Sequence, residues 1–140
     1  MEMNGIAHIQ ITVSDYSKCY PFYRKLFEFL EMKLVFDTEE LIYGVGSRTG
    51  ILVRGANEAY QNEVFEQWRI GLHHFCFRAR SREDIDGLYT FLSENGATIV
   101  HPPEDAAWAP GYYSVLFEDP DGIRIEANHV PGRGKLDPHS

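Results

Sequence analysis

The amino-acid pattern predicts an α+β protein built from two copies of a strand–helix–three-strand (βαβββ) module. Two stretches, residues 6–13 and 71–79, alternate polar and apolar side chains, as a strand with one buried face does. A helical pattern follows each stretch, over about 17–31 and about 82–94. Three shorter strand-like segments come after each predicted helix, so the same order of elements occurs twice along the chain.

Local signals indicate where these elements begin and end. Ser14, Asp15 and Ser81 suit the starts of the two helices, and Gly96 suits the end of the second. The run DPDG at 119–122 indicates a tight turn between the last two strands. The other predicted strands cover about 32–37, 40–46, 50–55, 97–101, 111–118 and 122–128.

We expect the 140-residue chain to form a single domain, because this length suits one compact unit. The segment after the first copy is polar and lacks a clear period, and the last residues are rich in glycine and proline. The expected parts are module one at about 5–55, a connection at about 56–70, module two at about 71–128 and a coil tail at 129–140.

The two modules are related by an alignment with one insertion. His8 and His74 occupy the first strand of each copy and lie 66 residues apart (74 − 8), whereas Gly50 and Gly122 lie 72 apart (122 − 50). The difference of six residues (72 − 66) predicts a longer loop in module two, within residues 101–111.

Three residues of the predicted modules have the chemistry of a metal site. His8 and His74 lie on the polar faces of the two first strands, and Glu126 lies near the end of the last strand. Two imidazoles and one carboxylate bind divalent Fe, Mn, Co, Ni or Zn and leave coordination positions open for a substrate. We therefore expect these three residues to hold one divalent ion if the polar faces of the two modules converge.

Composition and charge exclude other classes of function. The net charge is −8 and no basic stripe is present, which argues against nucleic-acid binding. No signal peptide and no apolar run of membrane-spanning length is apparent, so we expect a cytoplasmic protein that does not act at a membrane. Cys19 and Cys76 are then expected to be reduced thiols.

Three segments resemble the vicinal-oxygen-chelate superfamily, which includes glyoxalase I, fosfomycin-resistance proteins, bleomycin-resistance proteins and extradiol dioxygenases. They are HIQITVSD at 8–15, GLHHFCFRA at 71–79 and YYSVLFEDPDGIRIEANH at 112–129. The resemblance implies a concave mixed sheet of paired βαβββ modules, with the helices outside and metal ligands on the inner face. It also implies metal-assisted chemistry on small substrates that chelate through adjacent oxygens, and a homodimer.

The sequence departs from glyoxalase I at one ligand position. Glyoxalase I carries a carboxylate ligand in both modules, but the alignment through Gly50 and Gly122 matches Glu126 with Arg54. A guanidinium cannot ligate a metal, so ordinary glyoxalase I activity is disfavoured. Arg54 is instead a candidate to bind an anionic substrate group.

Other residues are candidates for contact with the substrate. Arg78 shares a face with His74, and Trp108 lies in the predicted loop, so both are candidate substrate-binding residues, although each also suits an ordinary surface or packing role. Tyr113 is a candidate catalytic residue that could supply a hydrogen bond or a proton. His73 is expected on the opposite face from His74, in a core or interfacial role.

Several readings of function stay open on the sequence alone. A metal-dependent lyase, transferase or dioxygenase is favoured by the proposed ligands, and ring cleavage with oxygen would need a redox metal. The alternative is a protein of the bleomycin-resistance type that binds a small molecule without turnover, or a scaffold that has lost its chemistry. Glu126 would then simply pair with Arg124 or Arg54.

Overall fold

The computed structural model describes residues 1–136 and divides into two compact units, Met1–Val64 and Phe65–Ser140. The first unit contains module one and the second contains module two. Residues 137–140 of the predicted tail, including His139, lie outside the described residues. Within the described part, no helix is long and apolar enough to cross a membrane.

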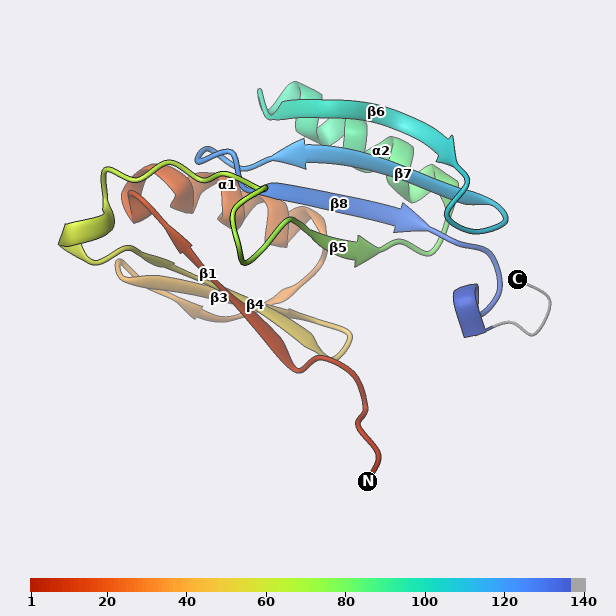
Figure 1. Cartoon of the computed structure of the whole chain (residues 1–140), viewed down its shortest axis with the longest axis horizontal. Coiled ribbons are helices and arrows are strands. Elements are labelled where there is room, and N and C mark those ends of the chain that lie inside the picture. Colours follow the sequence, from red (N-terminus) through yellow and green to blue (C-terminus); the bar gives the residue numbers. More distant parts are fainter. Residues whose placement is uncertain (137–140) are drawn as a thin grey trace. The chain divides into compact units, whose positions relative to one another are not determined.

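Module one is a four-stranded mixed sheet with one helix (Figure 1). The strand order is β1-β4-β3-β2; β1 is parallel to β4, and the other neighbours are antiparallel. A short 3₁₀ turn, η1 (Glu58–Tyr60), lies in the predicted connection. The elements are β1 (His8–Val13), α1 (Tyr16–Phe29), β2 (Lys33–Asp37), β3 (Leu41–Gly46) and β4 (Thr49–Gly55).

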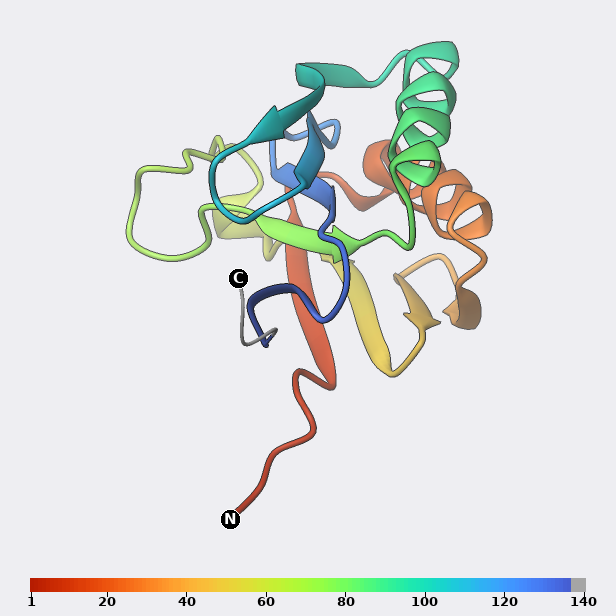
Figure 2. The same cartoon turned by 90° about the vertical axis from the view of Figure 1, so that its right-hand side faces the viewer.

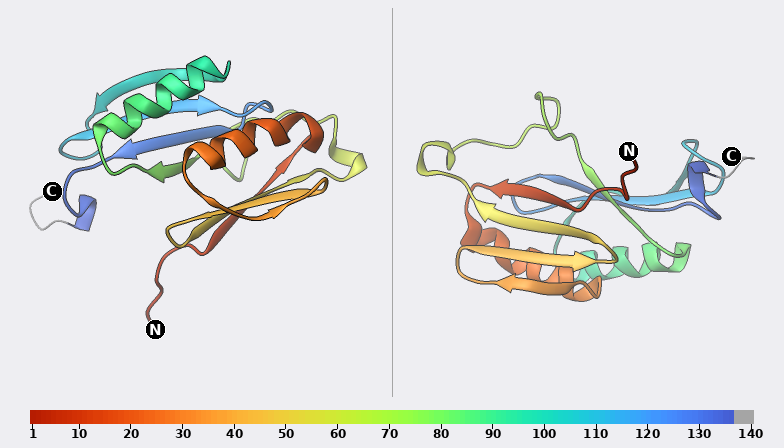
Figure 3. Two further views of the ribbon diagram at one scale, coloured as in Figure 1. Left: turned by 180° about the vertical axis from the view of Figure 1, so that it is seen from behind. Right: turned by 90° about the horizontal axis from the view of Figure 1, so that it is seen from below.

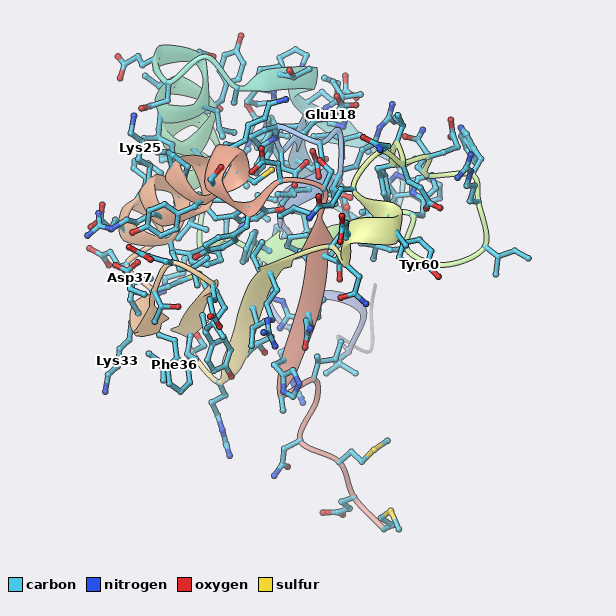
Figure 4. The ribbon with its side chains drawn as sticks, turned by 90° about the vertical axis from the view of Figure 1, so that its left-hand side faces the viewer. Lys25, Lys33, Phe36, Asp37, Tyr60 and Glu118 are labelled. Atoms are coloured by element: carbon cyan, nitrogen blue, oxygen red, sulfur yellow. The ribbon has the colours of Figure 1, made fainter. Side chains whose placement is uncertain are left out.

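Helix α1 covers one face of this sheet because its apolar residues gather on one side (Figure 3, left). Asp15 caps the helix by accepting a hydrogen bond from the Lys18 N–H. The edge strand is tied to the helix by Asp37, which accepts hydrogen bonds from Tyr20 and Arg24; Figure 4 shows Asp37 at the end of β2. The buried core includes Ile11, Val13, Tyr23, Leu26, Phe27, Ile42, Ile51 and Val53.

Module two repeats this arrangement with the strand order β5-β8-β7-β6, again with one parallel pair, β5 and β8. Ser81 and Asp84 form a capping box at the start of its helix. The elements are β5 (Phe75–Arg78), α2 (Arg82–Glu94), β6 (Thr98–Ala106), β7 (Tyr112–Glu118), β8 (Arg124–His129) and the 3₁₀ turn η2 (Gly134–Leu136). Its buried core includes Phe75, Ile85, Leu88, Leu92, Val115, Phe117, Ile125 and Ala127.

The two predicted βαβββ modules are therefore confirmed, but three local expectations are corrected. The strand expected at 71–79 begins only at Phe75, after a run of bends. The loop expected at 101–111 is largely strand: β6 runs to Ala106, with register shifts between Ile99 and Glu104. The coil tail expected from 129 starts later, because β8 includes His129, and it contains η2.

The alignment of the modules is also corrected by the strand register. His8 lies opposite Gly50 on β4, and Cys76 lies opposite Glu126 on β8. Gln10, two residues after His8, lies opposite Leu52, and Cys76, two residues after His74, lies opposite Glu126, so the module-one position equivalent to Glu126 is Leu52. Arg54, which lies opposite Thr12, is therefore not the counterpart of Glu126.

The alignment through Gly50 and Gly122 fails because the final hairpins of the two modules have turns of different length. In module one, Gly46 pairs with Thr49, so only two residues form the turn, whereas in module two Glu118 pairs with Arg124 across five residues. The conclusion that module one lacks a carboxylate ligand at this place is unchanged, because a leucine side chain has no donor atom for a metal.

Candidate functional site

The candidate site is built on the face of the module-two sheet that turns away from α2. In a parallel strand pair, opposed residues share a face, and residues two apart along a strand share it too. Cys76 is opposite Glu126, so both side chains point to this face, and the contact of His74 with Glu126 places the His74 ring there as well. Ile125 and Ala127 alternate with Glu126 and are buried on the other face. The short β5–β8 ladder thus brings together residues about fifty positions apart.

His74 and Glu126 are in direct contact. The His74 Nε2 lies 3.1 Å from Glu126 Oε2, with side-chain exposures of 36% and 14%. Donor atoms that bind one metal ion at about 2.0–2.2 Å lie roughly 3.0–3.5 Å from each other. The observed separation therefore suits two neighbouring ligands of one divalent ion, and the imidazole–carboxylate chemistry suits it as well.

Tyr112 orients the carboxylate. Its hydroxyl donates a hydrogen bond to Glu126 Oε1, the oxygen that does not contact His74. Burial, with the hydrogen bond to Glu126, raises the pKa of Tyr112 to about 12, so the hydroxyl keeps its proton at neutral pH. One carboxylate oxygen is thus held by a donor while the other faces the imidazole, as in the outer shell of many metal sites.

The neighbouring tyrosine, Tyr113, is not brought to this group. Its hydroxyl donates to Asp86 of α2 at 2.7 Å, and the Arg82 guanidinium lies 3.7 Å from its ring centroid. It therefore lies on the helix-side face, opposite Glu126. The tyrosine that contacts Glu126 is Tyr112, one position before the candidate that the sequence suggests.

The signal that identifies Tyr112 was present in the sequence. Across the final hairpin, Leu116 is opposite Glu126, and even-numbered residues of β7 therefore share the face of Glu126. Counting back from the DPDG turn with a period of two reaches Tyr112 rather than Tyr113.

His73 is placed differently from the expectation. Because β5 begins only at Phe75, strand alternation does not apply to His73 and His74, and their Nδ1 atoms lie 2.8 Å apart. Trp68 packs edge-on against the His73 ring, with centroids 5.0 Å apart. Figure 2 shows the loop that contains this segment running into β5. His73 is exposed and belongs to the surroundings of the site, not to the core.

Cys76 and Arg124 are the other polar groups that bear on the charge around Glu126. Desolvation of its sulfur, together with the charge of Glu126, raises the pKa of Cys76 to about 12, so its thiol is protonated at neutral pH. Arg124 Nε lies 3.4 Å from Glu118, so Arg124 has a carboxylate neighbour other than Glu126.

The remaining predicted substrate contacts in module two are exposed. Arg78 lies opposite Asn128 at the end of β5 and is exposed, on the face of Cys76 and His74. Trp108 is 73% exposed in the segment between β6 and β7. The structure therefore places Arg78 on the face of the His74–Glu126 pair and Trp108 at a loop.

In module one, His8 and Arg54 lie on the same face of the sheet but at opposite ends. His8 is opposite Gly50, and Arg54 is opposite Thr12, four residues farther along β1. At about 3.3 Å per residue this separation is about 13 Å along the strand. Both residues are exposed. Among residues 1–136, no cluster of three or more His, Cys, Asp or Glu side chains forms a metal-binding group.

The sequence and the fold were compared with those of known proteins. Residues 5–127 match the sequence profile of the Glyoxalase/Bleomycin resistance protein/Dioxygenase superfamily. The chain belongs to this superfamily. The match spans both modules and includes His8, His74 and Glu126, which confirms the resemblance identified from the sequence.

Two proteins and one solved structure are similar to this chain over most of its length. The Metallothiol transferase FosB of Shouchella clausii is 27% identical over 126 residues, covering 90% of this chain and 80% of the relative. The uncharacterized protein YqjT of Bacillus subtilis is 27% identical over 120 residues, covering 85% and 94%. A glyoxalase-like protein from Bacillus halodurans has a crystal structure that matches with a TM-score of 0.79 at 27% identity, covering 91% of this chain and 96% of that one.

Proposed function

We propose that this protein is a metal-dependent enzyme that acts on a small, oxygen-chelating and anionic substrate. The observation that carries the proposal is the 3.1 Å contact between His74 Nε2 and Glu126 Oε2, with the other carboxylate oxygen held by Tyr112. In this proposal His74 and Glu126 are ligands of a divalent ion, and His8 is the third protein ligand.

The chemistry follows from the donor set. A divalent ion bound there would act as a Lewis acid toward a substrate oxygen. His74 and Glu126 would hold it, and Tyr112 would keep Glu126 in place. Arg54 and Arg78 are proposed to bind the anionic part of the substrate, and Trp108 is proposed to contact its less polar part; these three roles are predictions of the sequence.

The names of the relatives indicate which reaction classes to test. A lyase, a transferase and a dioxygenase each occur among the activities that the superfamily name and its members include. Because FosB is a metallothiol transferase, addition of a thiol to a small electrophilic substrate is the first class to test. Dioxygenase chemistry would in addition require a redox-active ion such as Fe or Mn.

The alternative function is binding of a small molecule without turnover. It is favoured by one observation: His74 and Glu126 contact each other directly, as an ion pair would without any metal. A protein that uses the pair in this way should bind its ligand equally well in the presence of a chelator.

Metal content decides between the two. We expect protein purified without added metal to contain, or to take up, about one divalent ion per chain, because one ligand set is proposed. Elemental analysis and calorimetric titration with Zn, Mn, Fe, Co and Ni measure this directly. His74→Ala should weaken binding strongly, whereas His101→Ala, a control in β6, should not. A wild-type chain that takes up no ion at micromolar concentrations would rule out the metal enzyme.

The assembly of the site is a second part of the proposal. We propose a homodimer, as the resemblance implies. His8 would be supplied either by the partner copy or by the chain that supplies His74 and Glu126. Light scattering measures the mass of the protein in solution and so distinguishes a monomer from a dimer. Mixing His8→Ala with His74→Ala chains then tests sharing, because only a shared site regains a complete ligand set in the mixture. A stable monomer that binds metal would instead assign all three ligands to one chain.

A further inference from the structure

His73, which is outside the proposed ligand set, is hydrogen-bonded through its ring to the adjacent proposed ligand His74. Their Nδ1 atoms are 2.8 Å apart and their rings meet at an interplanar angle of 75°. A hydrogen bond between two ring nitrogens contains one proton, so one ring must donate and the other must accept. The direction of this bond depends on which nitrogen of each ring carries hydrogen.

The other nitrogen of His74 determines that direction. A neutral imidazole carries one N–H. If Nε2 of His74 donates to Glu126, its Nδ1 has only a lone pair and must accept from His73. If Nε2 of His74 instead uses its lone pair to bind a metal ion, Nδ1 must carry the hydrogen and donate to His73. The hydrogen bond between the rings therefore reverses when Nε2 of His74 exchanges its proton for a metal ion.

We propose that His73 is a positioning residue that holds His74 in the tautomer required for metal binding. This inference rests on the proposed function. The protons balance without any change of charge. The proton on His74 Nε2 is released to water, the proton between the rings passes from His73 to His74, and His73 Nε2 takes one proton from water. The number of protons on the pair of rings falls by one at His74 Nε2 and rises by one at His73 Nε2.

Trp68 holds the second ring of the pair. Its ring packs against His73 at a centroid distance of 5.0 Å and an interplanar angle of 71°, while 78% of Trp68 is exposed. The indole restricts rotation of the His73 ring, which would otherwise carry Nδ1 away from His74. Trp68, His73, His74 and Glu126 thus form a continuous row of contacts within the second compact unit.

Ring-nitrogen NMR of the full ¹⁵N-labelled chain tests the reversal. Zn²⁺ is the probe because it has no redox chemistry and no unpaired electrons. We expect hydrogen on Nδ1 of His73 without zinc and on Nε2 of His73 with zinc. A bound zinc ion that leaves the His73 tautomer unchanged would overturn the inference.

Variants provide an independent test. His73→Phe removes the acceptor and should weaken zinc binding by about 10–100-fold, the usual effect of losing an outer-shell partner. His73→Asn places an amide oxygen near the position of Nδ1 and should recover most of the affinity. His101→Phe is the matched control and should leave it unchanged. Circular dichroism confirms folding, and if the phenylalanine variant does not fold, the asparagine variant and the NMR result decide.

The outcomes separate this inference from the proposed function. If the wild-type protein binds no zinc, the proposed metal enzyme and the role of His73 both fail. If it binds zinc and His73→Phe binds equally tightly, the metal site stands and the inference about His73 is wrong.

Discussion

The two modules share their order of elements and differ in what their open faces present. Helix caps Asp15 and Ser81 are separated by 66 residues (81 − 15), the same spacing as His8 and His74, so the first half of each module matches without insertion. The second halves differ. Module two presents a carboxylate at Glu126, whereas module one presents Leu52 at the equivalent place.

The difference arises in the final hairpins. The turn of module two is longer, and the Asp119 carboxylate accepts hydrogen bonds from the backbone N–H groups of Asp121 at 2.9 Å and Ile123 at 2.8 Å. Asp119 is only 4% exposed, so the turn is closed by a buried side chain. Module two therefore presents an imidazole and a carboxylate in contact, at His74 and Glu126, whereas module one presents a single imidazole, at His8.

The largest expected effect concerns the two helix-covered cores. Leu26 in α1 and Leu88 in α2 are 0% and 2% exposed, and substitution of either by alanine should lower the free energy of unfolding by about 2–5 kcal/mol. Leu136→Ala, at a leucine that is 75% exposed, is the control. If the chain is one domain, both core variants shift a single denaturation transition. Two transitions, each moved by one variant, would show that the modules fold separately.

The next effect is on metal affinity. Glu126→Gln removes a proposed ligand charge and should weaken metal binding by at least about 100-fold, since even outer-shell losses cost about 10–100-fold. Glu118→Gln, at the carboxylate near Arg124, is the matched control and should have little effect. Calorimetric titration measures both. Equal affinities in the two variants would remove Glu126 from the ligand set.

A smaller effect is expected from the two neighbouring tyrosines. Tyr112→Phe removes the hydrogen bond to Glu126 and should weaken metal binding by about tenfold. Tyr113→Phe removes a hydrogen bond to Asp86 on the opposite face and should leave metal affinity unchanged. The same titration compares them. A larger loss in the Tyr113 variant would restore the original assignment of that residue.

The smallest effect tests the corrected alignment. Leu52→Glu places a carboxylate at the module-one equivalent of Glu126, and it should tighten metal binding, by up to about tenfold, if the open faces of the two modules form one site. Arg54→Glu should not tighten it, because Arg54 lies two residues farther along β4. The opposite ranking of the two variants would support the alignment through Gly50 and Gly122.

Much of the fold was predictable because its signals are local. The caps at Asp15 and Ser81 and the alternation of the first strands do not depend on distant contacts. The contact between His74 and Glu126 also agrees with the sequence, which predicts both residues on polar strand faces. The module-one counterpart of Glu126 could not be predicted from spacing alone, because a turn longer by a few residues changes the strand register.

The remaining errors have specific causes. Residues 101–111 are predicted as a loop from the six-residue difference in spacing between the modules, but residues 101–106 belong to β6, an edge strand, where Pro102 and Pro103 are tolerated. His73 is predicted on the opposite face from His74 because the predicted strand begins at residue 71, four residues before β5 begins. The alternation of faces holds only within a strand, so it does not place these two side chains.

The two prolines of β6 also bear on how the protein behaves at high concentration. β6 is the longest strand in residues 1–136, and its outer edge is unpaired within the sheet. Long unpaired edges attract strands from other molecules and start aggregation. Pro102 and Pro103 have no N–H to offer, and the register shifts on either side of His101 make the edge irregular. Although β6 is long enough to pair with a strand of another molecule, its edge is therefore poorly suited to such pairing.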